Sequence, residues 1–363
     1  QSACAITGSE CSAYFPSGSA QYHINSDIAH AVITYYFTTG DTDFMLNKGL
    51  EILIETSRLW LDVGHWYEGQ FRIDGVTGPD EYTCLVNNNY YTNLSAQYQL
   101  HNTLLICSQL ERACPAFSAL DRYGFTAAEK QSFQAAGDCM YLPYDEKLGV
   151  FAQDDSFLQK QRMELNELPK GALPLLLSLH PLAFYRKQVC KQADAVLAHF
   201  LYEDDLADDV IRRTYEYYEA LTTHDSSLSP CVFSMMAARI GQPEKAYNYY
   251  RYTAMMDLEN RHHNTDDGIH AASLGGAYMG IVFGFAGLRI HADGLSFRPC
   301  LPRALSGYGF PVHYRDARIR LQVDHGTIRL WLEHEGAMSV SVYGESHTIT
   351  AEPITIPLRQ ANG

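Results

Sequence analysis

Basic residues are scarce in this sequence of 363 residues, and the deficit excludes two classes of partner. Lysine and arginine total 27 against 42 aspartate and glutamate residues, which gives a formal net charge of −15. A chain with this excess of negative charge repels nucleic acid and anionic lipid. It also has no apolar run long enough to cross a bilayer. We therefore expect neither nucleic acid nor a membrane as a partner.

Cysteine follows no recognisable pattern, and the commonest short catalytic motifs are missing. The nine cysteines are an odd number, and no two of them form Cys-x-x-Cys. Reduced, buried thiols in a cytoplasmic protein are the interpretation that fits, so we predict a cytoplasmic location. The sequence has no His-Glu-x-x-His, no Walker loop and no Gly-x-Ser-x-Gly. These absences argue against a zinc protease, a P-loop nucleotidase and a serine hydrolase.

One cluster of histidines and aspartates could suggest a metal site. It comprises His262, His263, Asp266 and Asp267. The two histidines are adjacent, and the spacing fits no established set of metal ligands, so we predict a solvated loop there. Neither a metal nor a cofactor is expected.

Apolar residues recur at helical spacing through most of the chain. No strand-like alternation is evident before residue 290, and nothing resembles a repeated strand–helix–strand unit, so we predict an all-α toroid. Residues 141–180 form a mixed, proline-containing excursion between helices. The helices are predicted at residues 24–37, 44–63, 94–110, 127–140, 191–200, 206–221, 229–240, 243–257 and 269–285.

The pattern changes near residue 290. Apolar and polar residues alternate with period two, and Gly326, Gly336 and Gly344 fall between the alternating segments. This pattern predicts a small antiparallel β-sandwich. We therefore place a domain boundary there, with residues 1–289 helical and residues 290–363 forming the sandwich. The strands are predicted at residues 317–323, 327–332, 338–343 and 348–356.

The stretch from residue 71 to residue 93 is the candidate site of chemistry. Asp80 and Glu81 follow Gly78-Pro79, which marks a turn, and an asparagine-rich segment precedes the next helix. A loop anchored by a helix is a common place for reactive groups. The flanking aromatic residues, Phe71 and Tyr82, and the amides suit a polyhydroxylated substrate such as a sugar. The alternative is that Asp80 and Glu81 only decorate the N-terminus of a helix.

Residues 75–82 together with 86–93 resemble the catalytic-acid motif of glycoside hydrolase family 65. This family contains inverting phosphorylases of maltose, trehalose, kojibiose and nigerose, and a few hydrolases. Many members carry His-Glu directly after the Glu-Tyr pair, whereas Thr83-Cys84 follow Glu81-Tyr82 here, so the rim of the site is expected to differ. Further segments resemble the family in order, at residues 23–29, 190–196, 223–230, 267–270, 284–287, 294–297 and 301–302.

The resemblance has implications for the fold and assembly. It implies the later part of an (α/α)6 barrel, followed by the β-sandwich domain. We expect about half of a typical member to lie upstream of Gln1. Family phosphorylases are commonly dimers, which implies a homodimer. The loop at residues 11–20 would shape the subsite of the acceptor sugar, with Tyr14 and Phe15 available to stack on a ring.

The resemblance also assigns roles around the motif. Glu81 would be the acid that protonates the glycosidic oxygen, because glycoside cleavage needs a proton donor on one side of the bond. Asp80 would bind a substrate hydroxyl or orient the loop. Lys191 and Gln192 would contact the glucosyl unit or lie beside phosphate. Apart from the resemblance, a lone lysine on a helix normally lies on a solvated face.

Two further segments would hold phosphate. Ser226 and Ser227 precede a predicted helix, where backbone N–H groups favour anions. Gly268 permits a ligand to approach the backbone closely, and His270 can donate to a phosphate oxygen. The alternative for the serines is an ordinary helix N-cap.

The predicted function is inverting phosphorolysis of an α-glucosidic disaccharide, with the disaccharide and inorganic phosphate as partners. The products would be β-glucose 1-phosphate and a free sugar. Phosphate is already a nucleophile, so a phosphorylase needs no second carboxylate to activate water. One alternative is an α-glucoside hydrolase of the same family. The other is a non-catalytic carbohydrate-binding protein.

Overall fold

The computed structural model describes residue 7 and residues 18–169, 171–203, 206–261, 263 and 265–359. The predicted acceptor loop, with Tyr14 and Phe15, and also His262 lie outside these residues. Two compact units make up the chain. The first comprises Gln1–Tyr36 and Asp41–Asp225, and the second comprises Phe37–Gly40 and Ser226–Gly363. The domain boundary predicted near residue 290 stays a prediction.

The first unit contains long helices, and a buried network of hydrogen bonds joins three of them. The carboxamide oxygen of Gln99 accepts hydrogen bonds from Ser26 Oγ at 2.8 Å and from Trp60 Nε1 at 2.9 Å. All three side chains are buried, and these hydrogen bonds offset the cost of burying their polar atoms. The helices of this part are α1 (Ile24–Thr39), α2 (Thr42–Phe44), α3 (Leu50–Val63), α4 (Tyr90–Ala113), α5 (Ala119–Tyr123) and α6 (Ala127–Asp138), with a π-helical turn, η2 (Met45–Gly49), before α3.

Helix α4 begins four residues before the predicted start at residue 94. The carboxamide oxygen of Asn89 accepts a hydrogen bond from Thr92 N at 2.9 Å, so Asn89 is the N-cap of the helix. The sequence predicts a loop for the asparagine cluster at residues 87–89, but Asn89 caps the helix that follows. The first turns of α4 are buried on every side, so they lack the polar face on which the sequence pattern depends.

The prediction that no strand precedes residue 290 is wrong. Strand β1 (Gly64–Tyr67) pairs antiparallel with β2 (Gln70–Ile73), immediately before the candidate catalytic loop. Glu68 and Gly69 form the two-residue connection, and both have positive φ, as a turn that matches strand twist requires. Within the excursion at residues 141–180 and just after it lie the short strand pairs β3 (Tyr144–Asp145) with β4 (Val150–Phe151) and β5 (Gln161–Arg162) with β6 (Lys187–Gln188).

Four more helices belong to the first unit. They are α7 (Leu175–Ser178), α8 (Pro181–Phe184), α9 (Ala195–Leu201) and α10 (Asp208–Glu219), with 3-10 turns η3 (Phe157–Gln159) and η4 (Leu165–Glu167). Helix α9 starts later than predicted, so Lys191 and Gln192 lie in the turn before the helix.

The second unit opens with three helices. They are α11 (Ser229–Arg239), α12 (Pro243–Ala254) and α13 (Ala271–Met279), with a 3-10 turn η5 (Thr265–Asp267) before α13 and a π-helical segment η6 (Gly280–Phe285) after it. Helices α11 and α12 are joined by the Ser234 hydroxyl, which donates to the Ala246 carbonyl at 2.8 Å. Helix α13 packs on α11 where Gly276 meets Cys231.

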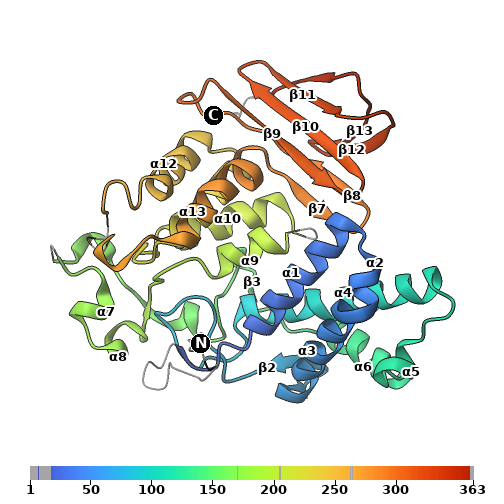
Figure 1. Ribbon diagram of the computed structural model, residues 1–363. Coiled ribbons are helices and arrows are strands. Elements are labelled where there is room, and N and C mark those ends of the chain that lie inside the picture. Colours follow the sequence, from blue (N-terminus) through green and yellow to red (C-terminus); the bar gives the residue numbers. More distant parts are fainter. Residues whose placement is uncertain are drawn as a thin grey trace. The chain divides into compact units, whose positions relative to one another are not determined.

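Two four-stranded sheets follow in the order β14-β11-β10-β9 and β13-β12-β8-β7, and Figure 1 shows β9, β10 and β11 side by side. The antiparallel prediction fails for one pair, because β8 and β12 run parallel. Each belongs to a different hairpin, and the two hairpins meet along these strands. The strands are β7 (Arg289–His291), β8 (Gly294–Phe297), β9 (Gly307–Tyr314), β10 (Ala317–Asp324), β11 (Thr327–Leu332), β12 (Met338–Val342), β13 (Glu345–Ile349) and β14 (Ile354–Pro357).

The predicted strand at residues 348–356 is two strands. It divides into β13 and β14, which belong to different sheets. Pro353 lies between them and lacks the N–H that a continuing strand would need. Elsewhere the alternation is confirmed. In β10, for example, Ile319, Leu321 and Val323 point into the core that both sheets share.

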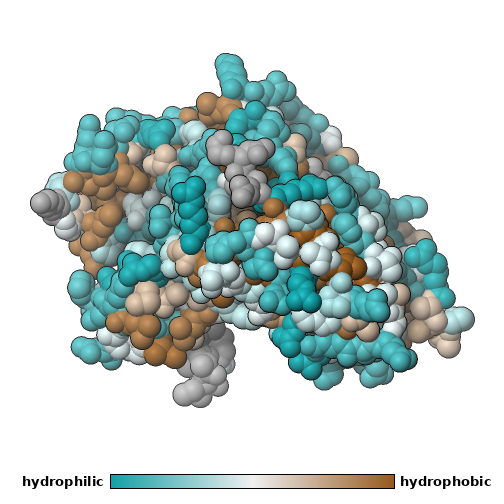
Figure 2. Space-filling view, turned by 90° about the horizontal axis from the view of Figure 1, so that it is seen from above, coloured by the Kyte–Doolittle hydropathy of each residue, from teal (hydrophilic) through white to brown (hydrophobic). Residues whose placement is uncertain are grey.

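The face shown in Figure 2 is mainly hydrophilic, and its hydrophobic residues form separate patches. None of the helices in the described part of the chain combines the length and the apolarity needed to cross a bilayer.

Adjacent glycines in α13 provide a test of the helix packing. A Cβ on Gly276 would lie 2.7 Å from Cys231 Cβ in α11, whereas a Cβ on Gly275 would meet no atom within 4 Å. We expect Gly275→Ala to raise the free energy of unfolding by about 1 kcal/mol, because alanine favours helix. Gly276→Ala should lower it by about 1–3 kcal/mol through overpacking. Urea denaturation followed by circular dichroism measures both, and equal effects of the two substitutions would contradict this packing.

Candidate active site

The candidate catalytic loop occupies residues 74–89, between β2 and α4. Its base is closed by two backbone hydrogen bonds between Val76 and Val86, at 2.9 and 2.8 Å. The Thr77 hydroxyl adds a third closing contact by accepting from Leu85 N at 3.2 Å. The tip that carries Asp80 and Glu81 is therefore held at both ends.

Gly78 allows the loop to lie directly on buried polar side chains. A Cβ at this position would lie 2.4 Å from both Asn89 Nδ2 and Asp194 Oδ2. Any larger residue would push the loop away from these groups. The Gly-Pro pair that marked a turn in the sequence thus also marks a close approach.

Asp80 has no exposed surface and is surrounded by hydrogen-bond donors. Its Oδ1 accepts from Lys191 N at 2.7 Å and from Tyr82 N at 3.2 Å. Its Oδ2 accepts from Gln153 Nε2 at 3.0 Å. Of the two roles predicted for Asp80, this burial favours orientation of the loop over contact with a substrate.

A second buried acid, Asp194, lies against the backbone of Asp80. Its carboxyl group accepts from Asp80 N at 3.3 Å and from Asn89 Nδ2 at 3.2 Å. Burial raises the pKa of Asp80 to about 6, although hydrogen bonds from Gln153 and from backbone N–H groups oppose the rise. Burial, together with the neighbouring Asp80, raises the pKa of Asp194 well above its usual range.

Glu81 is the more exposed member of the pair. Its side chain is 27% exposed and forms an ion pair with Lys191 Nζ. The Gln192 carboxamide donates to the carbonyl of Pro79, two residues before Glu81. The structure therefore brings together four of the residues predicted from the sequence, Asp80, Glu81, Lys191 and Gln192, from segments about 110 residues apart.

The two aromatic neighbours do not form a sugar platform. Phe71 is 2% exposed and Tyr82 is 1% exposed, so neither ring face is open to a ligand. Tyr82 instead packs against Phe184 with ring centroids 4.6 Å apart, and its hydroxyl donates to the Asp225 carboxylate. Burial, followed by the bond to Asp225, raises the pKa of Tyr82. The sequence pattern was misleading here because an aromatic residue in a loop can serve either the core or a ligand.

Sequence analysis missed three buried residues that support the loop, which are Asn89, Gln153 and Asp194. Asp194 lies within one of the segments that resemble the family, and Asn89 lies in the asparagine cluster. Gln153 gave no local signal. Its contacts with Asp80, Asn89 and Cys190 exist only in the folded chain.

The four residues predicted to bind phosphate belong to the second unit. Ser226 and Ser227 lie in the turn before α11, and the Ser226 hydroxyl accepts from Leu228 N at 3.3 Å. Gly268 has φ of +122°, a backbone conformation that favours glycine. His270 is the N-cap of α13. Gly276, in the middle of α13, packs against Cys231 in the first turn of α11.

No sequence pattern indicates the partner of His270. Asp257 accepts hydrogen bonds from His270 N, at 2.9 Å, and from Nδ1 of the ring. Because a carboxylate only accepts, Nδ1 carries the proton. The side-chain bond from His270 is the largest cause that lowers the pKa of Asp257. The imidazole ring is thus held in one orientation beside the first turn of α13.

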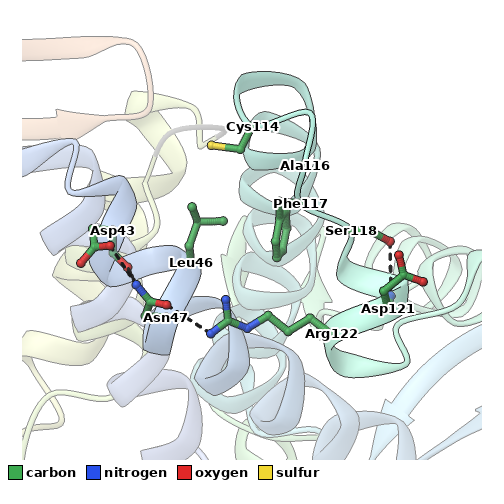
Figure 3. A pocket seen from close by; sticks show the side chains of 9 residues that line it. All are labelled: Asp43, Leu46, Asn47, Cys114, Ala116, Phe117, Ser118, Asp121 and Arg122. Carbon is green, nitrogen blue, oxygen red and sulfur yellow. Dashed lines mark hydrogen bonds between the residues drawn. The ribbon is translucent and has the colours of Figure 1, made fainter.

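A separate surface pocket of about 580 Å³ contains none of the predicted site residues. Figure 3 shows Leu46 and Phe117 projecting into it, while Arg122 donates to Asn47 Oδ1 at 3.3 Å. Within the described residues, no cluster of three or more histidine, cysteine, aspartate and glutamate side chains could hold a metal ion.

The raised pKa of Asp80 predicts a pH-dependent stability. Its pKa is about 6 in the folded chain and near 4 in an unfolded one, so in this range the folded state holds more protons. The protonated form of Asp80 therefore contributes its full stabilisation of the folded state below about pH 4. This stabilisation is lost as pH rises through about 6. We expect the free energy of unfolding of the wild type to fall by about 3 kcal/mol relative to that of Asp80→Asn between about pH 4 and pH 6, as measured by urea denaturation. A constant difference between the two would rule out the assignment.

Known proteins similar to this chain match it over nearly its whole length. The glycosyl hydrolase family 65 central catalytic domain matches residues 3–279, and the C-terminal domain of the same family matches residues 288–349. A solved structure, a putative kojibiose phosphorylase from the human microbiome, superposes with a TM-score of 0.87 at 28% identity, over 96% of this chain and 46% of that chain. This match agrees with the predicted fold class, an (α/α)6-barrel type of helical fold followed by a small β-sandwich.

Two relatives with assigned activities are similar in sequence. The α,α-trehalose phosphorylase of Geobacillus stearothermophilus is 50% identical over 354 residues, which is 97% of this chain and 46% of that protein. The maltose phosphorylase of Bacillus subtilis is 34% identical over 94% of this chain and 44% of that protein. The chain thus spans slightly less than half the length of these relatives. From the match to the central catalytic domain, the chain belongs to glycosyl hydrolase family 65.

Proposed function

We propose that this chain carries the proton donor and the phosphate site of an inverting α-glucoside phosphorylase. The observation that supports this most directly is the position of Glu81. It is the partly exposed carboxyl of the Asp80–Glu81 pair, next to residues that are anchored by buried hydrogen bonds, and it is paired with Lys191. A general acid needs such a fixed position within reach of the glycosidic oxygen.

The carboxyl groups next to Glu81 favour phosphorolysis over hydrolysis. An inverting hydrolase needs a second carboxylate to activate water. Asp80 is fully buried and Asp194 is 2% exposed, and both already accept hydrogen bonds from the protein. In the described part of the first unit, these two neighbours are therefore poor candidates for a water-activating base. Phosphate needs no such base.

In the proposed reaction the glycosidic C1–O bond breaks as phosphate attacks C1 from the opposite face. Glu81 gives its proton to the departing oxygen, and a new C1–O–P linkage forms with inverted configuration, which gives β-glucose 1-phosphate. A carboxyl group that donates a proton cannot also be the anionic partner of an ammonium group. We therefore propose that Lys191 leaves Glu81 when substrate and phosphate bind.

The proposed phosphate site uses Ser226, Ser227, Gly268 and His270. The first turns of α11 and α13 supply backbone N–H groups, and Gly268 leaves the backbone open to an anion. Asp257 fixes the ring of His270. A homodimer and a cytoplasmic location remain predictions of the sequence.

The disaccharide proposed first is α,α-trehalose. Two trehalose phosphorylases, from Geobacillus stearothermophilus and Thermoanaerobacter brockii, are 50% and 44% identical to the chain. The maltose and kojibiose phosphorylases are 34% and 31% identical. This difference supports trehalose as the starting substrate for the assays below, which use a polypeptide of the relatives' full length.

Glu81→Gln should abolish phosphorolysis while leaving the fold intact. The amide keeps the size of the side chain but has no acidic proton, so we expect kcat to fall by about 10²–10⁴-fold. Turnover is measured by release of glucose from trehalose in phosphate buffer. Glu68→Gln, on the exposed tip of the β1–β2 hairpin, is the matched control and should leave kcat unchanged. Near-native activity of Glu81→Gln would remove Glu81 as the acid.

The products distinguish phosphorylase from hydrolase and from a binding protein. With trehalose and phosphate we expect one β-glucose 1-phosphate for each free glucose, and no turnover in phosphate-free buffer. Free glucose as the sole product, formed equally fast without phosphate, would favour the hydrolase. If calorimetry detects binding of glucose and phosphate but no product forms under any condition, the carbohydrate-binding alternative holds.

A further inference from the structure

We infer that Asp194 is a positioning residue for the proton donor, acting through the backbone of Asp80 on the placement of Glu81. The inference rests on the proposed role of Glu81 as the acid. Nothing in the sequence beyond its place in a segment that resembles the family pointed to Asp194, and its role emerges from its contacts.

Asp194 occupies the N-cap position of α9 but does not cap that helix with its side chain. An N-cap aspartate usually accepts from the first turn of its own helix. Here the carboxyl group accepts instead from Asp80 N at 3.3 Å and from Asn89 Nδ2 at 3.2 Å. The side chain thus joins the start of α9 to the catalytic loop and to the start of α4.

The contact is tight as well as polar. The missing Cβ of Gly78 would fall 2.4 Å from Asp194 Oδ2, so the loop backbone rests directly on the carboxyl group. Asp194 is 2% exposed, and its burial raises its pKa. An acid is costly to bury in such a place, and an apolar residue could fill the space without that cost. The hydrogen bonds that the carboxyl makes to the loop are what an apolar residue would lack.

Residues 191–194 hold the loop at three points on the two residues before Glu81. Lys191 N donates to the Asp80 side chain, Gln192 donates to the Pro79 carbonyl, and Asp194 accepts from Asp80 N. Loss of the third point frees the backbone immediately before Glu81. A displacement of about 1 Å in a catalytic group can cost about 10²-fold in rate.

Two substrates separate this role from a merely structural one. Trehalose needs a proton on its departing oxygen, whereas α-glucosyl fluoride releases fluoride without one. In Asp194→Ala we expect kcat for trehalose to fall about 10²-fold, with KM changed by less than about threefold. We expect kcat for the fluoride to stay within about threefold of wild type.

Two further variants sharpen the measurement. Asp194→Asn keeps the size of the side chain and an acceptor oxygen for Asp80 N, so it should recover part of the rate with trehalose. It also serves if Asp194→Ala fails to fold. Asp209→Ala, an exposed aspartate of α10 paired with Arg213, is the control and should behave as wild type.

The outcomes are distinct. Equal loss of both substrates in Asp194→Asn, or no loss of either in a folded Asp194→Ala, would overturn the inference. Phosphate-independent release of glucose by wild type would refute the phosphorylase, but the comparison of substrates would remain valid because a hydrolase uses the same acid.

If wild type turns over neither substrate, hydrogen exchange decides. The Asp80 amide donates to Asp194, so Asp194→Ala should speed exchange in a peptide covering residues 78–86 and leave β10 and β11 unchanged. Unchanged exchange in that peptide would overturn the inference.

Discussion

The hydrogen bonds between the loop at residues 78–82 and the segment at residues 191–194 are the constraint on which the site depends. Asp80 accepts from Lys191 N at 2.7 Å, and its own N–H donates to Asp194. Without these bonds the backbone before Glu81 would be free to move, and the partly exposed Glu81 side chain is paired with a lysine that is itself partly exposed. The geometry of the acid is therefore set by neighbours that never face a substrate.

Burying two acids lowers the stability of the fold, but their hydrogen bonds fix the position of the catalytic loop. Two carboxyl groups that ionise in water are buried here, and burial raises the pKa of both. Burying acids is unfavourable unless donors surround them. Gln153, Asn89 and three backbone N–H groups supply the donors here. The same bonds that offset the cost also fix the loop, so the energetic penalty and the functional geometry have one origin.

Sequence patterns were reliable where a residue's role depends on its near neighbours. The alternation in β10 and β11 and the start of α11 at Ser229 were predicted because period and turn chemistry act over a few residues. The failures have equally physical causes. The first turn of α4 is buried on all sides and shows no helical period. The parallel pairing of β8 with β12 joins two hairpins, and no local signal specifies it.

The sequence by itself determined the helical character of the chain, the small sheet domain after residue 290, and a loop carrying an acidic pair at residues 80 and 81. Spacing alone could not distinguish the two acids, since adjacent carboxyl groups look alike in a sequence, and only the family resemblance assigned Glu81 as the acid. Tertiary structure decided that Asp80 is buried and Glu81 partly exposed, that Phe71 and Tyr82 belong to the core, and that Asp194 supports the loop. These outcomes depend on contacts across about 110 residues, which exist only once the helices have packed.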